Sequence, residues 1–464
     1  MIYDAVIVGC GLSGLGAGIR LAMFDKKVLI VEKHTVIGGL NSFYSRKGRV
    51  FDVGLHAMTN YSPKGVRSSP LGKLLKQLRF RHDDFRLCQQ NMSEIRFPDN
   101  SLRFTNDFNF FEQEVADQFP QQIDGFRRLV KRVNSFDELS LRDDVEISSR
   151  QVLESYLTDP VLIDMLFCPL MYYGNAKEGD MDFYQFVIMF KSIFQEGFAK
   201  PLGGMPYILN LMVDKYKGLG GELRMGAGVE SINSENGVVR SVTLAGGETL
   251  ETRKVISSAG YVETLRLCDI PAEDAKEPEI GRMSFMESLF VIDREPRDLG
   301  YDKAIIFFCA EPSFIYRVPE ELTNVTSGVL CCPNNFDYPE PLKEGMIRLT
   351  NQANFALWDA LPRKEYIAAK KECRARGVES LLKFFPDFRD NVVFLDTFTP
   401  KTIHKYTGHL NGAVYGSPDK KKDGKMPIKN LFICGTDQGF LGIVGATLSG
   451  ISMANLHVLM ADRP

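Results

Sequence analysis

Residues 5–14 read AVIVGCGLSG, and this stretch decides the fold class of the chain. Its first four residues are an uninterrupted apolar run, which is typical of a strand buried in a parallel sheet. Gly9, Gly11 and Gly14 then give the pattern G-x-G-x-x-G. The first glycine allows a tight turn, the second lets the backbone approach a diphosphate, and the third lets helix and strand pack closely. We therefore expect a strand, a glycine turn and a helix whose N-terminal amides face a diphosphate.

An acidic residue ends the next apolar strand. Residues 28–31 read VLIV, and Glu32 follows them, eighteen residues after Gly14. A carboxylate at this place can accept hydrogen bonds from both hydroxyls of an adenosine ribose, and it repels a 2′-phosphate. A lone glycine pattern is weak evidence, but the order strand, glycines, helix, strand and acid is strong. The N-terminal stretch predicts a dinucleotide site whose expected contacts are Gly9, Gly11, Leu12, Ser13, Gly14, Glu32 and Lys33.

The C-terminal end carries a complementary pattern. Residues 430–437 read NLFICGTD, which predicts a strand that ends in Gly435 and Asp437 and leads toward a helix from residue 442 to about 460. Small residues at the helix start, Gly445 and Ala446, permit close approach of a flat ring, and the helix dipole favours negative charge at one edge of a flavin. We expect Asp437 to meet a ribityl or diphosphate group. Residues 438–460 contain no Asp, Glu, Lys or Arg and could be taken for a membrane span, but the flavin helix is the better interpretation. The two chain ends together favour FAD over NAD.

Composition limits the remaining classes of function. The chain has 464 residues, 44% of them hydrophobic, and a formal net charge of -3, which gives no reason to expect a nucleic-acid partner. Nine cysteines without a C-x-x-C pair suit a reducing compartment. The first residues lack the basic region of a signal peptide, so we expect a cytoplasmic protein, with peripheral contact on the inner face of the membrane. Six histidines without ligand spacing predict no metal site.

Further motifs link the chain to a known family. They are Gly38-Gly39, residues 51–56 (FDVGLH), residues 200–205 (KPLGGM), residues 228–230 (GVE), residues 406–408 (YTG) and residues 412–416 (GAVYG). With the two flavin patterns, they run over most of the length. The chain thereby resembles the phytoene desaturase and carotenoid isomerase family of FAD-dependent oxidoreductases, to which retinol saturase also belongs.

The resemblance implies an α/β fold, with a Rossmann-like FAD-binding domain of the glutathione-reductase/amine-oxidase type and an inserted α+β substrate domain. The FAD-binding domain is expected to be discontinuous, at residues 1–70, 200–265 and 395–464. Residues 71–199 and 266–394 would form the substrate domain, with a helical part that could face a membrane. In such enzymes the strand at Val229 places a backbone amide against the adenine. Leu40 stands where many members carry arginine. Further implied FAD contacts are Gly39, Leu40, Asn41, Gly54, Leu55 and His56.

The implied activity is desaturation or cis–trans isomerisation of a long apolar isoprenoid, a carotenoid precursor. The sequence does not identify the electron acceptor. His56 and Tyr406 are the candidate catalytic residues, although a buried histidine bonded to backbone is an equal interpretation of His56. Alternatives on the same fold are a hydroxysqualene-type dehydroxylase, a saturase or an amine oxidase. An alternative of another class is a flavin-free carrier of prenylated partners, against which the complete glycine set, Glu32 and Asp437 argue.

A phenylalanine stripe and two basic clusters each have competing interpretations. Phe186, Phe190, Phe194 and Phe198 recur at every fourth residue and form one helical face. This face favours ordinary core over a substrate tunnel or a membrane-contacting surface. Two basic clusters, residues 127–132 (RRLVKR) and residues 420–422 (KKK), are either solvated surface or sites for anionic lipid head groups.

Overall fold

The apolar run of residues 5–8 forms β1, the middle strand of a five-stranded parallel sheet. The computed structural model describes residues 2–54, 57–136, 146–269 and 278–460. Within them the parallel sheet draws its strands from the beginning, the middle and the end of the chain, and its strands are mostly buried, as their apolar sequences require. The sheet order is β19 (Leu431–Ile433), β13 (Val255–Ser257), β1 (Ala5–Val8), β2 (Val28–Glu32) and β9 (Glu222–Met225).

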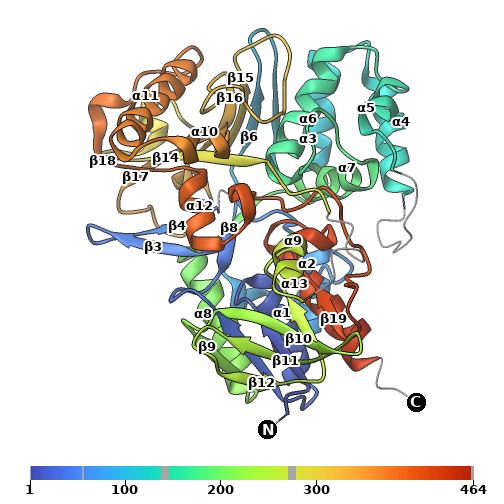
Figure 1. Ribbon diagram of the computed structural model, residues 1–464. Coiled ribbons are helices and arrows are strands. Elements are labelled where there is room, and N and C mark those ends of the chain that lie inside the picture. The colour runs from blue at the N-terminus through green and yellow to red at the C-terminus, as the bar shows by residue number, and fades with distance from the viewer. Residues whose placement is uncertain (1, 55–56, 137–145, 270–277, 461–464) are drawn as a thin grey trace.

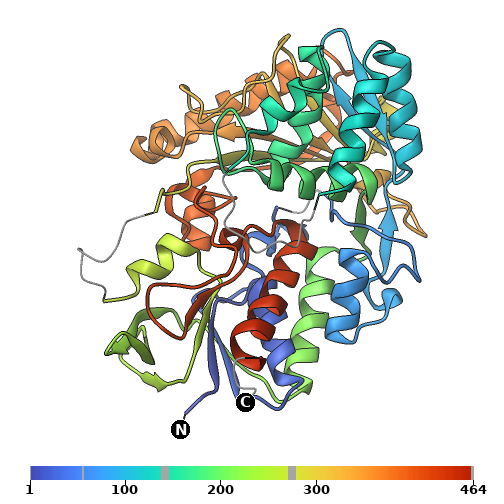
Figure 2. The same cartoon turned by 90° about the vertical axis from the view of Figure 1, so that its right-hand side faces the viewer.

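Each face of this sheet is covered by different elements, which together with it make the lower lobe in Figure 1. A small antiparallel sheet covers one face and helices cover the other, where three of them lie side by side in Figure 2. The prediction of a Rossmann-like domain is confirmed. The antiparallel sheet consists of β10 (Val229–Glu235), β11 (Val238–Leu244) and β12 (Thr249–Glu251); the helices are α1 (Leu12–Ala22), α2 (Pro70–Leu78), α8 (Gly204–Gly218) and α13 (Gly442–Ala454), while α9 (Tyr261–Arg266) follows β13.

The upper lobe is built on a seven-stranded mixed sheet with helices packed on it (Figure 1). Its strands, in sheet order, are β18 (Val392–Phe398), β14 (Ser284–Ile292), β17 (Gly345–Ala353), β16 (Ser327–Cys331), β15 (Ile305–Cys309), β6 (Ser93–Arg96) and β7 (Ser101–Phe104). Its helices are α3 (Phe108–Gln118), α4 (Ile123–Asn134), α5 (Ser149–Glu154), α6 (Pro160–Gly174), α7 (Phe183–Phe190), α10 (Phe355–Ala360) and α11 (Arg363–Leu381).

Short elements join the two lobes. The hairpin of β3 (Phe43–Arg46) and β4 (Arg49–Asp52), the pair β5 (Leu87–Gln89) and β8 (Ala199–Pro201), and α12 (Pro400–Thr407) lie between them. The domain limits differ in detail from those expected. The leucines of α2 pack with α1 and α13, so the first lower-lobe segment extends beyond residue 70. Residue 395 lies inside β18, a strand of the upper sheet, because that strand pairs with β14.

The phenylalanine stripe is core, as the favoured interpretation had it. Phe186, Phe190 and Phe194 are completely buried, and neighbouring rings along the stripe lie 5.8 and 5.2 Å apart. Phe194 also stacks on Phe111 of α3 at 4.4 Å. These rings fill the space between helices and therefore form neither a tunnel wall nor a membrane-contacting face.

Close helix packing joins the two ends of the chain. A Cβ on Gly16 of α1 would lie 2.6 Å from the carbonyl oxygen of Thr447, and a Cβ on Gly450 of α13 would overlap the carbonyl of Ser13. Of the described residues, one helical window, Gly442–Leu459, is long and apolar enough to cross a membrane, but 56% of it is buried in the fold. The contact with α1 explains its apolar composition, since α13 is a core helix, as predicted.

Replacing Gly450 with alanine tests this packing. Gly450→Ala should lower the free energy of unfolding by about 1–3 kcal/mol, because the added methyl group meets backbone that cannot move aside. Thermal unfolding monitored by circular dichroism measures the change. Gly218→Ala is the matched control, since that helical glycine has no atom within 4 Å of an added Cβ, and it should be neutral or slightly stabilising. Equal unfolding temperatures for the two variants would contradict the packing role.

Candidate cofactor and substrate site

The glycine turn after β1 has the geometry that its sequence predicts. Gly9 has φ +96°, a conformation that side chains rarely adopt. A Cβ on Gly14 would overlap the carbonyl of Gly9, so this glycine serves helix–strand packing. A Cβ on Gly11 would meet only the carbonyl of Gly38, at 3.9 Å, and would otherwise project into open space. That space is where the backbone can approach a diphosphate.

The carboxylate of Glu32 stabilises the glycine turn between β1 and α1. Its carboxylate accepts the backbone amides of Cys10 and His34, each at 2.8 Å. Each carboxylate oxygen can accept a second hydrogen bond, and Glu32 lines the cavity described below. Burial, together with the charge of Glu32, raises the pKa of the Cys10 thiol to about 12, so this cysteine is a neutral packing residue. Glu32 is thus placed both to fix the turn and to receive ribose hydroxyls.

A cavity of about 960 Å³ runs from this turn to the underside of the upper sheet. It brings together most of the residues predicted to contact FAD. Gly14 and Gly445 do not line it, because Gly14 packs against Gly9 and Gly445 lies nearest to Phe440. Leu55 and His56 lie outside the described residues. The predicted contacts that line the cavity are Gly9, Gly11, Leu12, Ser13, Glu32, Lys33, Gly39, Leu40, Asn41, Gly54, Val229, Gly435, Asp437 and Ala446.

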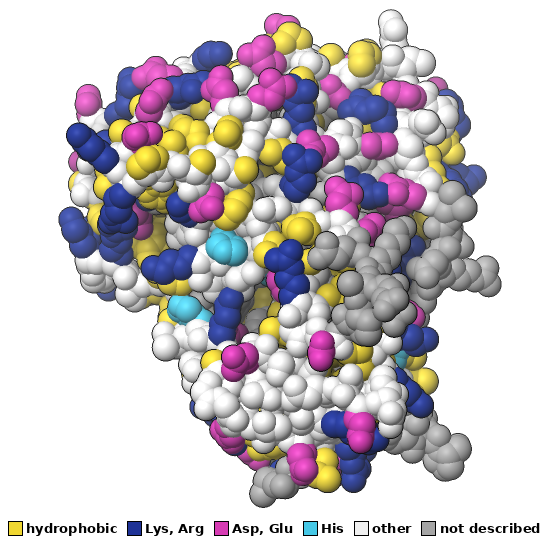
Figure 3. Space-filling model, in the orientation of Figure 1, with side chains coloured by type: hydrophobic (Ala, Val, Ile, Leu, Met, Phe, Trp, Pro, Cys, Tyr) yellow, Lys and Arg dark blue, Asp and Glu magenta, His cyan; other side chains and the backbone are white. Residues whose placement is uncertain are grey.

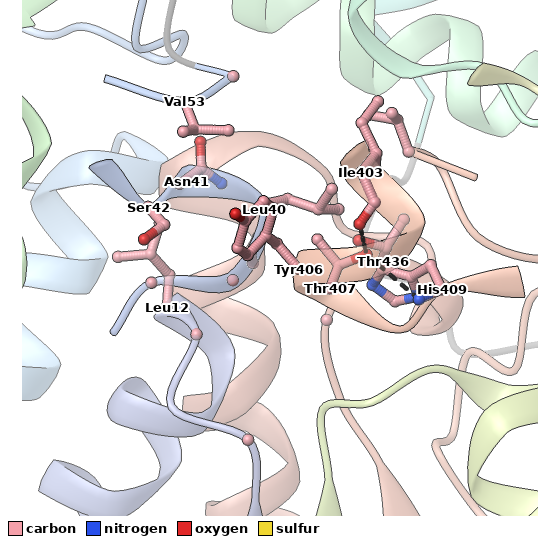
Figure 4. A pocket seen from close by; sticks show the side chains of 18 of the residues that line it. Leu12, Leu40, Asn41, Ser42, Val53, Ile403, Tyr406, Thr407, His409 and Thr436 are labelled. Carbon is pink, nitrogen blue, oxygen red and sulfur yellow. Dashed lines mark hydrogen bonds between the residues drawn. The ribbon is translucent and has the colours of Figure 1, made fainter. Parts of the chain in front are cut away.

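Tyr406 lies at the adenosine end of the cavity. Figure 4 shows Leu12 and Asn41 on one side of the view, Ile403 and Thr407 of α12 on the other, and Tyr406 between them. The Tyr406 ring packs edge-on against His34, with centroids 5.3 Å apart, and His34 is two residues beyond Glu32. Tyr406 is also 48% exposed. Tyr406 therefore lines the cavity close to Glu32, and the catalytic role predicted for it stays a prediction.

A short strap that follows α12 closes on the lower lobe. The strap, η7 (Leu410–Gly412) with His409, is held by Glu263 of α9. The Leu410 amide donates to Glu263 Oε1 at 2.8 Å, and His409 Nδ1 lies 3.5 Å from the same oxygen. Burial alone would raise the pKa of Glu263, but the bonds and charge of His409 and the Leu410 amide lower it overall. Ionised Glu263 therefore holds the strap in place beside the end of the cavity where the nucleotide part of FAD is expected.

Asp437 has a structural role in addition to the predicted one. Its carboxylate accepts the backbone amides of Tyr261 at 2.6 Å and Ser417 at 2.8 Å, and its side chain is almost fully buried. Lys420 lies 3.7 Å from it. Burial lowers the pKa of Lys420, although the charge of Asp437 opposes that change. The carboxylate thus fixes two loops around the cavity that it lines, and its predicted contact with a ribityl or diphosphate group stays a prediction.

The neighbouring basic cluster is packed as well. Lys421 lies over the ring of Tyr261 at 5.1 Å and Lys422 over that of Tyr184 at 4.4 Å. Residues 420–422 are therefore no solvated run free to meet head groups. In the other cluster, Arg127 pairs with Glu112 at 2.9 Å on the exposed side of α4. For residues 127–132 both interpretations, solvated surface or a site for anionic lipid head groups, stay predictions.

The inner end of the cavity is apolar and aromatic. Its wall includes one cross-strand row of the upper sheet, in which Phe398, Glu287, Thr350 and Val329 lie directly opposite one another. The remaining wall comes from α6, α7 and β14 of the upper lobe, from the segment after η7 and from the residue before α13. These other inner residues are Tyr172, Tyr173, Met189, Phe285, Val414, Tyr415 and Leu441.

A buried charge pair lies in this wall. Arg348 Nε donates to Glu287 Oε1 at 2.7 Å, and both side chains are nearly inaccessible. Burial would lower the pKa of Arg348, but Glu287 raises it overall, so the guanidinium stays charged. Sequence reasoning missed this pair, because only the register of β14 on β17 places the two side chains together. A buried pair is costly to form, and its place at the cavity marks it as functional or as a joint between lobes.

Asp52 provides that joint. Arg348 Nη2 donates to the Asp52 carbonyl at 3.2 Å, and the Asp52 carboxylate accepts Lys200 Nζ at 3.2 Å and the Met205 amide at 2.8 Å. Asp52 ends β4, whereas Lys200 lies in β8 and Arg348 in β17. The network therefore fixes the upper sheet relative to β8 and to the first turn of α8.

The residues present fit FAD. The open space at Gly11, the carboxylate of Glu32 and the strand at Val229 suit an adenosine diphosphate. Gly442 and Ile443 begin α13 at the cavity, where helix amides favour the electron-rich edge of a flavin. Among the described residues no cluster of potential metal ligands occurs, and all nine cysteines are free thiols.

Comparison with known proteins agrees with this geometry. A sequence profile of flavin containing amine oxidoreductases matches residues 12–456. The chain is 24% identical to a chloroplastic prolycopene isomerase of Arabidopsis thaliana, over 99% of this chain and 83% of that protein. It is 24% identical to an all-trans-retinol 13,14-reductase of Danio rerio over 98% and 87% of the two chains. A lycopene-forming phytoene desaturase of Pseudescherichia vulneris is also 24% identical, over 62% of each chain.

Solved structures share the fold at low identity. An oxidoreductase from Methanosarcina mazei superposes with a TM-score of 0.69 and 17% identity, over 97% of this chain and 99% of that one. Putrescine oxidase bound to putrescine gives a TM-score of 0.66 and 16% identity over 99% of both chains. The family resemblance and the FAD cofactor expected from the sequence are confirmed.

A side chain at Gly11 should expel the cofactor without unfolding the protein. Gly11 has φ -79° and ψ 180°, which valine adopts without strain. Gly11→Val should therefore keep the fold but weaken FAD binding by roughly hundredfold, or about 2.8 kcal/mol. Titration of apoprotein with FAD, followed by flavin fluorescence, measures the affinity. Gly218→Val is the control, with space around it but no cavity. Unchanged FAD affinity in Gly11→Val would show that the diphosphate lies elsewhere.

The strap latch should respond to acid. Because the folded-state pKa of Glu263 is lowered, its contribution to stability is present above the ordinary glutamate pKa of about 4.3 and is lost as pH falls further. Thermal unfolding of the FAD-loaded protein between about pH 6 and pH 3 should thus fall less steeply for Glu263→Gln than for the wild type. Glu230→Gln, an exposed carboxylate on β10, is the control. Identical slopes for Glu263→Gln and the wild type would reject the latch.

Proposed function

The chain belongs to the flavin containing amine oxidoreductase family and is an FAD-dependent oxidoreductase, and on that premise we propose that its substrate is a long apolar isoprenoid. The proposed reaction is desaturation or cis–trans isomerisation of a carotenoid precursor. The single observation that carries this proposal is the inner end of the cavity, which is lined by apolar and aromatic side chains of the upper lobe. The names of the relatives, which describe carotenoid and retinoid enzymes, support it.

The residues of the chain supply position and exclusion of water. When bound, the flavin supplies the redox chemistry, since its ring accepts or returns electrons and hydride. Met189, Phe285 and Val329 line an enclosed space in which a polyene segment can lie. Leu441 and Gly442 border the start of α13, where the flavin ring is expected. An apolar substrate in this place would be held by packing, and water would be kept from the reacting bond.

The amine oxidase alternative finds less support in the cavity wall. Putrescine oxidase shares the fold, and Glu287 lends the wall a carboxylate that an ammonium group could use. The charge of Glu287 is matched, however, by that of Arg348 at hydrogen-bond distance. The wall therefore offers no net negative charge to a cationic substrate, whereas a neutral isoprenoid needs none. A saturase or dehydroxylase would use the same apolar space and remains the second candidate.

Pigment analysis in a producing host tests the proposed substrate. Expression of the chain in bacteria that accumulate either phytoene or poly-cis-lycopene should change the pigment in one of the two hosts, because desaturation consumes the first compound and isomerisation the second. Chromatography with diode-array detection identifies the product. Unchanged pigments in both hosts, with flavin-loaded protein present, would reject both reactions.

Filling the inner cavity should block that conversion while sparing the cofactor. In Val329→Trp the larger side chain enters the space opposite Thr350, and conversion should fall by about tenfold or more because the reacting bond is displaced. The ratio of flavin to protein, read from the absorption spectrum, should stay unchanged. Val66→Trp, at an exposed position, is the matched control. Full activity in Val329→Trp would place the substrate outside this cavity.

A further inference from the structure

The cavity opens to solvent where β3, β18, α11 and α12 meet. Ser45 and Arg46 of β3 belong to the cavity lining and are exposed, which places an opening here. Four elements that are distant in the sequence therefore share one entrance. We call it the cavity mouth and define it by the lining residues Tyr44, Ser45, Arg46, Lys370, Asp396, Thr397 and Thr402.

Asp396 is the acidic residue of the cavity mouth, and its neighbours already use its carboxylate. Its Oδ1 accepts Arg46 Nη1 at 2.5 Å and the backbone amide of Thr397 at 2.8 Å. Its Oδ2 accepts the hydroxyl of Tyr44 at 3.2 Å. Burial, together with the charge of Asp396, raises the pKa of the Tyr44 phenol, so that this group stays neutral. The negative charge of the mouth is thus matched by Arg46.

Two further cations reach the mouth from α11. Lys370 lines the mouth, and Arg374, one turn later on the same helix, donates to Thr397 Oγ1 at 3.2 Å. Within the described ranges, neither cation has a carboxylate at ion-pair distance. The ammonium of Lys370 lies 5.7 Å from the centre of the Tyr366 ring, which attracts it but supplies no counter-charge. Both cations therefore lack an anionic partner.

Partial burial makes these two cations costly. Burial lowers the pKa of Lys370, although the nearby Tyr366 and Asp396 oppose that change. Burial also lowers the pKa of Arg374, again against the charge of Asp396. Since Asp396 already pairs with Arg46, two positive charges are left unmatched at the mouth. An anion bound between them would lower the electrostatic cost of their burial.

The unmatched charge is confined to the mouth. Figure 1 places β18, α11 and α12 at the left of the molecule, and Figure 3 shows Lys and Arg side chains gathered there around hydrophobic atoms. Inward from the mouth, the lining continues through Phe398 to Glu287, whose charge is matched by Arg348. An anion that enters the cavity therefore meets its best partners at the mouth.

The diphosphate of FAD is expected elsewhere. Its expected place is the start of α1 in the lower lobe, where a Cβ on Gly11 would project into open space. Lys370 and Arg374 lie on α11, which is a helix of the upper lobe. FAD in its expected place is held by the lower lobe, so the cations of the mouth are left for another anion.

We propose that the cavity mouth binds the diphosphate group of a small-molecule ligand through Lys370, Arg374 and Arg46. Ammonium and guanidinium groups form charge-assisted hydrogen bonds with phosphate oxygens, and Arg46 keeps further N–H donors after its bond to Asp396. Each phosphate of the group carries negative charge, so one diphosphate can match both unpaired cations. Dinucleotides and isoprenyl diphosphates share this group. The site goes beyond the proposed substrate and does not rest on it.

Titration of the FAD-loaded protein tests the cavity mouth. The probes are inorganic pyrophosphate, NAD+ and farnesyl diphosphate, and calorimetry gives the dissociation constant of each. Pyrophosphate should bind, and added salt should weaken its binding. Tighter binding of NAD+ or of farnesyl diphosphate would identify the class of molecule that supplies the group, whereas equal constants would assign the site to the diphosphate alone. Farnesol, which lacks the diphosphate, is the control for the apolar tail.

Substitutions on α11 separate the site from general attraction by a basic surface. Lys370→Gln should raise the dissociation constant for pyrophosphate by about tenfold or more, because a charge-assisted bond is lost. Lys370→Arg keeps the positive charge and should bind nearly as well as the wild type. Lys371→Gln is the matched control, since this neighbouring lysine is exposed and does not line the mouth. It should bind like the wild type.

Binding of none of the three diphosphates by the wild type would overturn the proposal, as would an equal loss of affinity in Lys371→Gln. Loss of FAD from Lys370→Gln would also overturn it, since the cation would then serve the cofactor. The ratio of flavin to protein, read from the absorption spectrum, reports that loss. Val329→Trp should bind pyrophosphate normally. Failure of the substrate hypothesis and failure of the diphosphate site are thereby distinguishable.

Discussion

The close contact of α1 with α13 is the constraint on which the rest of the structure depends. Gly16 and Gly450 let two helices from opposite ends of the chain approach until side chains have no room. This contact puts the phosphate-facing start of α1 and the cavity-facing start of α13 beside one parallel sheet. The FAD site is complete only when both ends of the chain are folded together. Cofactor binding therefore depends on the folding of the whole chain.

The second constraint is polar and acts between the lobes. Asp52 receives bonds from Lys200, Met205 and Arg348, and Arg348 in turn holds Glu287 in the cavity wall. A hydrophobic contact of equal area would allow the lobes to slide, because dispersion has little direction. Hydrogen bonds between buried charges require fixed geometry, and breaking one partner leaves the others uncompensated. The network therefore sets the distance between the expected flavin ring and the upper sheet, whose residues line the inner end of the cavity.

Local patterns could be predicted from the sequence, and contacts between distant segments could not. The turn at Gly9, the carboxylate of Glu32 and the C-terminal helix follow from neighbours within one βαβ unit or one strand–helix pair. The carboxylate of Asp437 accepts the amides of Tyr261 and Ser417, which only the folded loops bring near it. Tyr406 likewise belongs to a recognisable local motif, residues 406–408, but its place beside His34 depends on how α12 packs against the lower lobe. The pair of Glu287 with Arg348 depends on strand register, for which the chain carries no local signal.

Exposure is the quantity that composition predicts least well, and it decides the surface chemistry of this protein. Phe186 and its neighbours have the pattern of a membrane-contacting face, yet helices of the upper lobe cover them completely. Lys420 belongs to a run of three lysines, yet it lies beside Asp437 in the interior. Leu395 stands in unremarkable sequence, but it belongs to β18 at the edge of the upper sheet and is 43% exposed.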